Sequence, residues 1–271
     1  PTVRHQQYAG YKRTRPSMPE ALIAQLPLVK TLLQAYRIPV FACEGYEGED
    51  VLATMTRQLV KTGVEVFLVT GDKDLLQLVN HQVKVYSPHK EETILDAASV
   101  RARYGVEPEQ MVDLMALMGD AIDDIPGVPG VGEKTARALI QRFGSVKELY
   151  QRLGELEHPA RRAVLEAHRA QVEQSSLLVR LYTDVPLDLC LDDLTRKEPD
   201  WPALRSLFRD LEFKQWLREI ETQSPRTLSV VPRTQQVSTA QALDTLLSSL
   251  TRSAQHPVAI LGWSFGAAPT T

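Results

Sequence analysis

Acidic side chains are gathered in three short clusters, and each cluster follows an apolar run and precedes a turn or helix signal. The clusters occupy residues 45–51, 70–74 and 119–124, and their acids include Glu47, Glu49, Asp50, Asp72, Asp74, Asp120 and Asp123. One such cluster is ordinary at a helix start, because the positive end of the helix dipole favours carboxylates. The recurrence of the pattern predicts one shared cation site instead of three separate helix caps.

Carboxylates in this number repel one another at close range unless cations neutralise them. Hard oxygen ligands suit Mg²⁺ or Mn²⁺ and not zinc, and the sequence has no Cys/His metal pattern and no P-loop. Two such ions about 3.5–4 Å apart activate a water and stabilise a leaving oxygen in phosphodiester hydrolysis. A phosphatase built on Gly71 and Asp72 would need an Asp-x-Asp motif upstream, and the sequence has none. The acids therefore favour a metal-dependent nuclease.

Two further stretches suit nucleic acid. Residues 4–16 are basic with Tyr8 and Tyr11 interleaved, which suits phosphate contacts and stacking on unpaired bases. A solvated, flexible terminus explains that composition equally well. Residues 125–136 indicate a glycine-punctuated hairpin that opens a helix, with Lys134 in its first turn. Gly130 and Gly132 permit close backbone approach there, and the helix presents free N–H groups to an anion.

The overall composition is typical of a globular protein. The chain has 271 residues, of which 43% are hydrophobic and 24% charged, and its net charge of −3 argues against a generally basic nucleic-acid binder. No apolar run approaches the ~18 residues that span a bilayer, and no segment reads as a signal peptide. Cys43 and Cys190 imply no disulfide framework, so we expect a reducing cytoplasm.

The elements that position the clusters follow from hydrophobic periodicity and turn residues. We expect strands at residues 40–43, 64–69 and 83–86, and helices at 19–36, 46–61, 96–104, 108–118, 133–143, 146–153, 159–174 and 202–220. Pro27 predicts a kink or break in the first helix, and Gly63 closes the second. Strand–helix–strand alternation predicts an α/β fold with a parallel sheet. Ligands bind beyond the carboxyl ends of such strands, where the first two acid clusters lie.

Five motifs occur in order: residues 11–15, 45–51 and 70–75, then Asp120 with Asp123, then residues 126–136. Together they resemble the 5′ nuclease domain of bacterial DNA polymerase I, a relative of the flap endonucleases. The resemblance implies a PIN-like α/β core, with a mostly parallel sheet flanked by helices, over residues 1–95. It implies a helical subdomain with a helix-hairpin-helix over residues 96–220. The implied activity is 5′–3′ exonuclease and flap endonuclease cleavage of DNA with a free 5′ end or of an RNA primer–DNA hybrid, in replication and repair.

The resemblance also implies roles for individual residues. One metal region would be held by Glu47, Glu49, Asp50, Asp72 and Asp74, and the other by Asp120 and Asp123, with two Mg²⁺ or Mn²⁺ ions. Glu49 stands where the family commonly has Asp and is one methylene longer. Lys12 and Arg15 match the basic residues that address the scissile phosphate. The expected DNA-binding residues are Arg4, Tyr11, Lys12, Arg13, Arg15, Gly127, Gly130, Gly132, Lys134 and Thr135. The hairpin is also expected to hold a K⁺ ion.

The remaining expectations concern the ends of the chain and the parent protein. The family begins with a strand bearing a catalytic Asp, and a second Asp precedes the basic stretch. This chain starts after both, at Pro1, so we expect an N-terminally truncated fragment that is inactive or nearly so, or a non-catalytic duplex-DNA-binding module. Residues 221–239 read as a linker. Residues 240–271 read as the start of a truncated 3′–5′ exonuclease-like domain, deficient in proofreading because it lacks an Asp-x-Glu pair. The expected parent is a monomer in the bacterial cytoplasm at the nucleoid, without membrane contact, and carries a polymerase domain.

Overall fold

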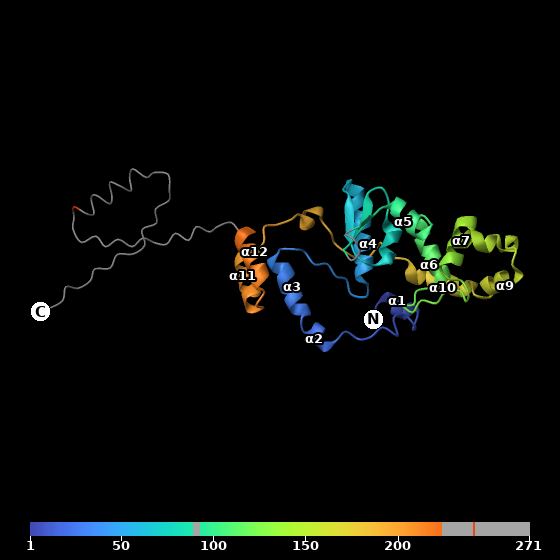
Figure 1. The fold of residues 1–271 in the computed structure, drawn as a ribbon, viewed down its shortest axis with the longest axis horizontal. Coiled ribbons are helices and arrows are strands. Elements are labelled where there is room, and N and C mark those ends of the chain that lie inside the picture. The colour runs from blue at the N-terminus through green and yellow to red at the C-terminus, as the bar shows by residue number, and fades with distance from the viewer. Residues whose placement is uncertain (89–92, 224–240, 242–271) are drawn as a thin grey trace. The chain divides into compact units, whose positions relative to one another are not determined.

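The computed structural model describes residues 1–88, 93–223 and 241 (Figure 1). The chain divides into two units, Pro1–Ile220 and Glu221–Thr271. The predicted 3′–5′ exonuclease-like segment and most of the predicted linker lie outside the described residues. Within the part of the chain that is described, no helix is long and apolar enough to cross a membrane.

A small mixed sheet forms the centre of the first half of the chain. Its strands are β1 (Val66–Val69), β2 (Val83–Ser87) and β3 (Thr93–Leu95), in the order β1-β2-β3. β1 and β2 are parallel, with Val66 opposite Val83, whereas β3 runs antiparallel to β2, with Leu95 opposite Val85. The predicted parallel pair is therefore confirmed, and the sequence analysis missed the short antiparallel edge strand.

Helices make up most of the rest. The α-helices are α1 (Val3–Gln7), α2 (Glu20–Ile23), α3 (Leu26–Ala35), α4 (Gly48–Leu59), α5 (Ala97–Tyr104), α6 (Met111–Met118), α7 (Glu133–Phe143), α8 (Val146–Gln151), α9 (Pro159–Ala167), α10 (Arg169–Val179), α11 (Trp201–Asp210) and α12 (Lys214–Gln223). Short 3₁₀ helices are η1 (Val60–Thr62), η2 (Lys73–Leu78), η3 (Pro108–Gln110), η4 (Leu153–Glu155) and η5 (Leu191–Leu194).

Local sequence signals account for several helix ends. The Asp96 carboxylate accepts the Ser99 N–H at 2.8 Å and starts α5, and the Ser145 hydroxyl accepts the Glu148 N–H at 3.1 Å and starts α8. Gly63 follows η1 with a φ of 83°, the left-handed conformation expected after a helix. These capping residues fix where the loops between the elements begin.

The helix expected at 19–36 is broken between α2 and α3, as Pro27 predicted. Three other predicted elements differ from the structure. The helices expected at 159–174 and 202–220 are each two helices. The second break contains Glu212, whose φ of 56° cannot continue a right-handed helix. The strand expected at residues 40–43 is wrong: these residues are irregular, and Val40 is 56% exposed. An apolar run forms a strand only beside a pairing partner, and no described strand lies next to it.

The main core is built around α6. Leu114, Met115, Ala116 and Leu117 are each fully buried, because α6 packs against α10, α7 and η2. A helix that is apolar on all sides must be enclosed in this way. A smaller cluster of Ala35, Leu204, Phe208 and Ile220 joins α3 to α11 and α12. Because α6 is held rigidly, its C-terminal end is a fixed support for the acids that follow it.

Candidate acidic site and hairpin

Asp72 and Asp74 are positioned by the turn that follows β1. The Thr70 N–H donates to the Tyr86 carbonyl at 3.0 Å and extends the β1–β2 ladder by one residue. The Asp72 N–H then donates to the Thr70 hydroxyl at 3.0 Å, and the Asp72 carboxylate accepts the Asp74 N–H at 2.9 Å. Both carboxylates therefore lie at the carboxyl edge of the sheet, as predicted for this cluster. The cluster at residues 45–51 was also expected at a strand end, but it follows no strand, because residues 40–43 are irregular.

Asp120 and Asp123 are positioned by a tight turn at the end of α6. Asp120 and Ile125 exchange backbone hydrogen bonds of 2.9 and 2.8 Å, which closes the turn between them. The Asp120 carboxylate accepts the Ile122 N–H at 2.8 Å. Gly119 precedes the turn with a φ of 76°, and a side chain there would collide with the backbone of Gly127. A glycine is needed at this position to bring the third acid cluster against the first strand end.

The two turns face one cavity of about 400 Å³. Asp72, Asp74, Asp120 and Asp123 all line it. The Lys73 ammonium also lies there, 2.9 Å from a carboxylate oxygen of Asp120. Two of the three sequence clusters therefore meet at one site.

The charges in this cavity are incompletely neutralised. Burial, followed by the nearby carboxylates of Asp72 and Asp120, raises the pKa of Asp74 to about 7. Burial also raises the pKa of Asp123. The charge of Lys12 lowers this pKa, and the nearby carboxylates of Asp120 and Glu47 offset part of that lowering. Burial alone would lower the pKa of Lys73, but its hydrogen bond to Asp120 and the charge there raise it. The cavity thus favours additional positive charge.

Glu47, from the first cluster, is linked to this site through two residues of the basic arm. The Lys12 ammonium lies 2.9 Å from Glu47 and 3.5 Å from Asp123. The Tyr11 hydroxyl donates to the other oxygen of Glu47 at 2.9 Å and to Asp123 at 3.4 Å. Glu47 itself precedes α4. All three acid clusters therefore contribute to one connected network.

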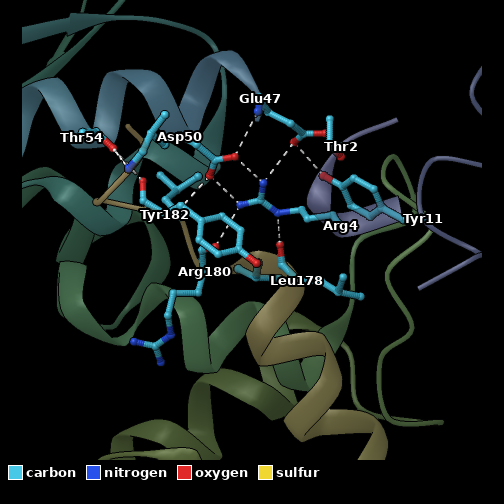
Figure 2. A network of polar contacts seen from close by, with 12 residues as sticks. Thr2, Arg4, Tyr11, Glu47, Asp50, Thr54, Leu178, Arg180 and Tyr182 are labelled. Carbon is cyan, nitrogen blue, oxygen red and sulfur yellow. Dashed lines mark hydrogen bonds and ion pairs between the residues drawn. The ribbon is translucent and has the colours of Figure 1, made fainter. Parts of the chain in front are cut away.

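Asp50 lies away from the cavity and is paired with Arg4. Figure 2 shows the guanidinium of Arg4 in a two-pronged ion pair with the Asp50 carboxylate, with distances of 2.6 and 2.8 Å. Both side chains are almost completely buried. The same carboxylate accepts the backbone N–H of Glu47 at 3.1 Å and that of Tyr182 at 3.0 Å. Burial alone would lower the pKa of Arg4, but Asp50 raises it above its ordinary value.

Arg4 also connects this pair to α10. Its guanidinium donates to the carbonyls of Leu178 at 2.7 Å and Arg180 at 2.9 Å, at the C-terminal end of the helix (Figure 2). Residues earlier in α10 hold the hairpin: the side chains of Gln171 and Ser175 donate to the carbonyls of residues 127 and 126, at 2.8 and 2.7 Å. One helix therefore links the Glu47–Asp50 region to the hairpin.

The hairpin presents its glycines to the surface. Gly130 has a φ of 75°, and Gly132 immediately precedes α7; a side chain at either position would meet no other atom within 4 Å. Gly127 differs, because a side chain there would collide with the carbonyl of Met118. Lys134, in the first turn of α7, is exposed. The open glycines and the exposed lysine leave this backbone accessible to a ligand, whereas Gly127 has a packing role.

The structure also distinguishes the residues of the basic arm. Arg13 and Arg15 are exposed, whereas Arg4 and Tyr11 are only 2% and 3% exposed and are engaged inside the protein. Asp124, which the sequence analysis did not select, accepts the Thr14 N–H at 2.7 Å and so anchors the arm. Its φ of 54° is one that aspartate tolerates better than most residues.

Arg103 and Tyr104 line the cavity and were also missed, since neither belongs to a recognisable motif.

The candidate ligands are of the chemical type that binds a divalent cation, but their side chains are not close enough together in this structure to hold one. Within the described residues, no three His, Cys, Asp or Glu side chains converge closely enough to hold a metal ion. All candidate ligands are carboxylates, which is the chemistry that Mg²⁺ and Mn²⁺ prefer. The ammonium groups of Lys12 and Lys73 lie between these carboxylates. They supply part of the positive charge that a metal ion would bring.

Comparison with protein families gives two consecutive matches. Residues 1–105 match the family described as 5′–3′ exonuclease, N-terminal resolvase-like domain, and residues 106–202 match 5′–3′ exonuclease, C-terminal SAM fold. The boundary between them lies ten residues beyond the predicted one at residue 95.

Several characterised proteins are similar in sequence. The 5′–3′ exonuclease of Aquifex aeolicus is 36% identical over 220 residues, which is 81% of this chain and 74% of that protein. DNA polymerase I of Bacillus caldotenax is 38% identical over 226 residues, which is 82% of this chain and 26% of that protein. The thermostable DNA polymerase I of Thermus aquaticus is 39% identical over 233 residues, 86% of this chain and 27% of that protein. The chain thus spans about a quarter of the length of these polymerases.

Solved structures share the fold. T5 5′-exonuclease with bound zinc ions is 21% identical, with a TM-score of 0.58 over 82% of this chain and 80% of that chain. The catalytic core of Rad2 in complex with a DNA substrate is 19% identical, with a TM-score of 0.56 over 83% of this chain and 77% of that chain. The chain therefore shares its overall fold with T5 5′-exonuclease and with the catalytic core of Rad2.

Proposed function

The chain belongs to the 5′–3′ exonuclease family, and from that premise we propose that it is the 5′ nuclease part of a longer DNA polymerase I. Its reaction is hydrolysis of phosphodiester bonds in DNA that carries a free 5′ end or a flap, and in RNA primer–DNA hybrids. The observation that carries this proposal is the convergence of acids from two turns on one cavity, with Glu47 joined to them by Lys12.

Two Mg²⁺ or Mn²⁺ ions would be held by Asp72, Asp74, Asp120, Asp123 and Glu47. When bound, such ions activate a water and stabilise the leaving oxygen of a phosphodiester. Glu49 is a further candidate ligand, because it lies partly exposed in the first turn of α4 and its carboxylate forms no hydrogen bond or ion pair within the described residues. Asp50 is better explained as the partner of Arg4, because both of its oxygens are engaged in the interior.

The basic arm has two tasks in this proposal. Lys12 holds Glu47 and Asp123 close together while no other cation does so. Once cations neutralise these acids, its ammonium can turn to the scissile phosphate, which Arg15 also addresses from the surface. The hairpin, with Gly130, Gly132, Lys134 and Thr135, grips duplex phosphates through its backbone without reading sequence. A K⁺ ion at the hairpin, a monomeric state and action at the bacterial nucleoid complete the proposal.

The test is strand scission of an end-labelled 5′-flap duplex with Mg²⁺ or Mn²⁺, with a chelator as the blank. We expect cleavage by the full-length parent, and loss of cleavage in its Lys12→Ala and Asp120→Asn variants without loss of duplex binding. Arg196→Ala provides a control on a surface far along the chain from every predicted site residue. Cleavage that persists in the chelator would contradict the proposal.

The alternative function is a duplex-binding module without turnover. It is favoured by the two lysine ammonium groups that already pair with the acids, and by the lack of a closed three-carboxylate cluster in the described residues. Tight duplex binding with no metal-dependent scission would support this alternative. The two functions are therefore separated by one cleavage assay combined with one binding assay.

A further inference from the structure

A free guanidinium lies at the edge of the acidic cavity. Four aspartates line this cavity, and the cationic side chains among its described lining residues are Lys73 and Arg103. Lys73 is paired with Asp120 at 2.9 Å. Arg103 is exposed and forms no ion pair with any described residue, although carboxylates surround the same cavity. Among the described residues its positive charge therefore has no acidic partner.

The position of Arg103 on α5 explains why it stays unpaired. Its guanidinium carbon lies 5.2 Å from the ring centre of Tyr104, which also lines the cavity. A cation over an aromatic face is attracted to it, and a cation in the last turn of a helix is favoured by the helix dipole. Tyr104 is itself held, since it packs against the main core. These contacts keep the guanidinium at the rim instead of letting it turn onto the aspartates.

A nuclease with this cavity needs a cation at its rim. A strand that enters among four carboxylates brings its own negative phosphates, and the repulsion must be offset outside the ring of acids. A guanidinium is the best side chain for this purpose, because its planar fork matches two phosphate oxygens at once. Lys73 cannot serve in the same way while it pairs with Asp120.

We propose that Arg103, held in place by Tyr104, is a phosphate-binding residue for the strand that enters the acidic cavity. This inference rests on the proposed nuclease function and extends it to a subsite on α5. The ligand is a DNA phosphate, either an internal phosphodiester next to the bond that is cut or the terminal 5′-phosphate of the strand. Both present the same oxygens to a guanidinium.

The variants for the test are Arg103→Gln, Arg103→Lys and Arg101→Gln. Arg101 is the matched control: it lies two residues earlier on α5, is also exposed, pairs with Glu107 at 2.9 Å and does not line the cavity. Both positions are on the surface, so we expect all three variants to fold.

The measurement is the affinity for a 5′-flap DNA over a range of salt concentrations, with Ca²⁺ in place of the catalytic ion. We expect Arg103→Gln to weaken binding about fivefold and to lower the slope of log K against log salt by roughly 0.7–0.9, the loss of one phosphate contact. Arg103→Lys should restore the slope but only part of the affinity, because it keeps the charge and loses the fork. Arg101→Gln should behave like the wild type.

Two arms identify the phosphate. If the effect of Arg103→Gln is present only with a 5′-phosphorylated strand, the ligand is the terminal phosphate; if it is equal with a 5′-hydroxyl strand, the ligand is an internal phosphodiester. Wild-type binding with no difference between Arg103→Gln and Arg101→Gln would overturn this inference and leave the nuclease proposal intact. Failure of the wild type to bind flap DNA at all would instead remove the proposed function.

Discussion

The buried pair of Arg4 and Asp50 gives the sharpest test of how the site is held. The change is Asp50→Asn, which preserves the shape of the side chain and removes its charge. Arg4 would then remain in the interior with two backbone carbonyl partners, and the nearest carboxylate left to it would be that of Glu47 at 3.7 Å. The Arg4 and Asp50 side chains are 3% and 0% exposed, so solvent screens the pair very little.

The expected cost follows from this burial. Removing one partner of a buried ion pair lowers the free energy of unfolding by about 3–5 kcal/mol, chiefly because the other charge is left uncompensated. In a chain of this size the melting temperature should fall by roughly 10 °C. Replacing both partners, in Arg4→Met with Asp50→Leu, should cost less than Asp50→Asn alone, because no buried charge is then left.

The assay is urea unfolding followed by circular dichroism, together with a Mn²⁺ titration of each folded variant. Thr54→Val is the matched control, because it removes another buried polar contact of α4, in which the Thr54 hydroxyl accepts the Val185 N–H at 3.1 Å. It should cost only about 1–3 kcal/mol and leave Mn²⁺ binding unchanged. If Asp50→Asn unfolds like the wild type but binds Mn²⁺ much more weakly, then Asp50 is a metal ligand and our reasoning is wrong.

Three further outcomes follow from the site. The pKa of Asp74 is raised from 3.8 to about 7, so the folded state binds the extra proton; metal-free protein should lose stability as pH rises between these values, and Asp74→Asn should flatten the profile. Lys73→Met should tighten Mn²⁺ binding several-fold by calorimetry, because Asp120 loses its internal cation; weaker binding would refute this role. Gly127→Ala should destabilise the fold by about 1–3 kcal/mol, because its methyl group meets the carbonyl that ends α6. Gly132→Ala, in open space, should be neutral in the same melting assay.

The sequence predicted what depends on local rules. Ligands bind at the carboxyl ends of the strands in a parallel sheet, which is why Asp72 and Asp74 were expected at the end of β1. Capping residues such as Asp96 fixed helix starts for the same local reason. Partners that are distant in sequence could not be found in this way. Arg4 and Asp50 are 46 residues apart, and considered alone Arg4 was assigned to DNA binding and Asp50 to metal binding.

Arg103 illustrates the opposite limit. Nothing in its local sequence marks it, because its proposed role depends on the cavity that it lines and on the absence of an ion pair within the described residues. The apolar residues at 40–43 show a third limit: a strand-like pattern does not form a strand unless a neighbouring strand supplies hydrogen bonds. Pattern therefore predicts elements, whereas pairing and burial depend on the assembled fold.

The helix α10 has a consequence for where a strand would be cut. It contacts the hairpin through Gln171 and Ser175 and the Arg4 pair through the Leu178 carbonyl, so these contacts lie within roughly 10 Å of one another along the helix. A single helix therefore fixes the distance between the hairpin and the Arg4 pair. If the hairpin clamps the duplex, the incision point is measured in base pairs from that clamp and is insensitive to base sequence.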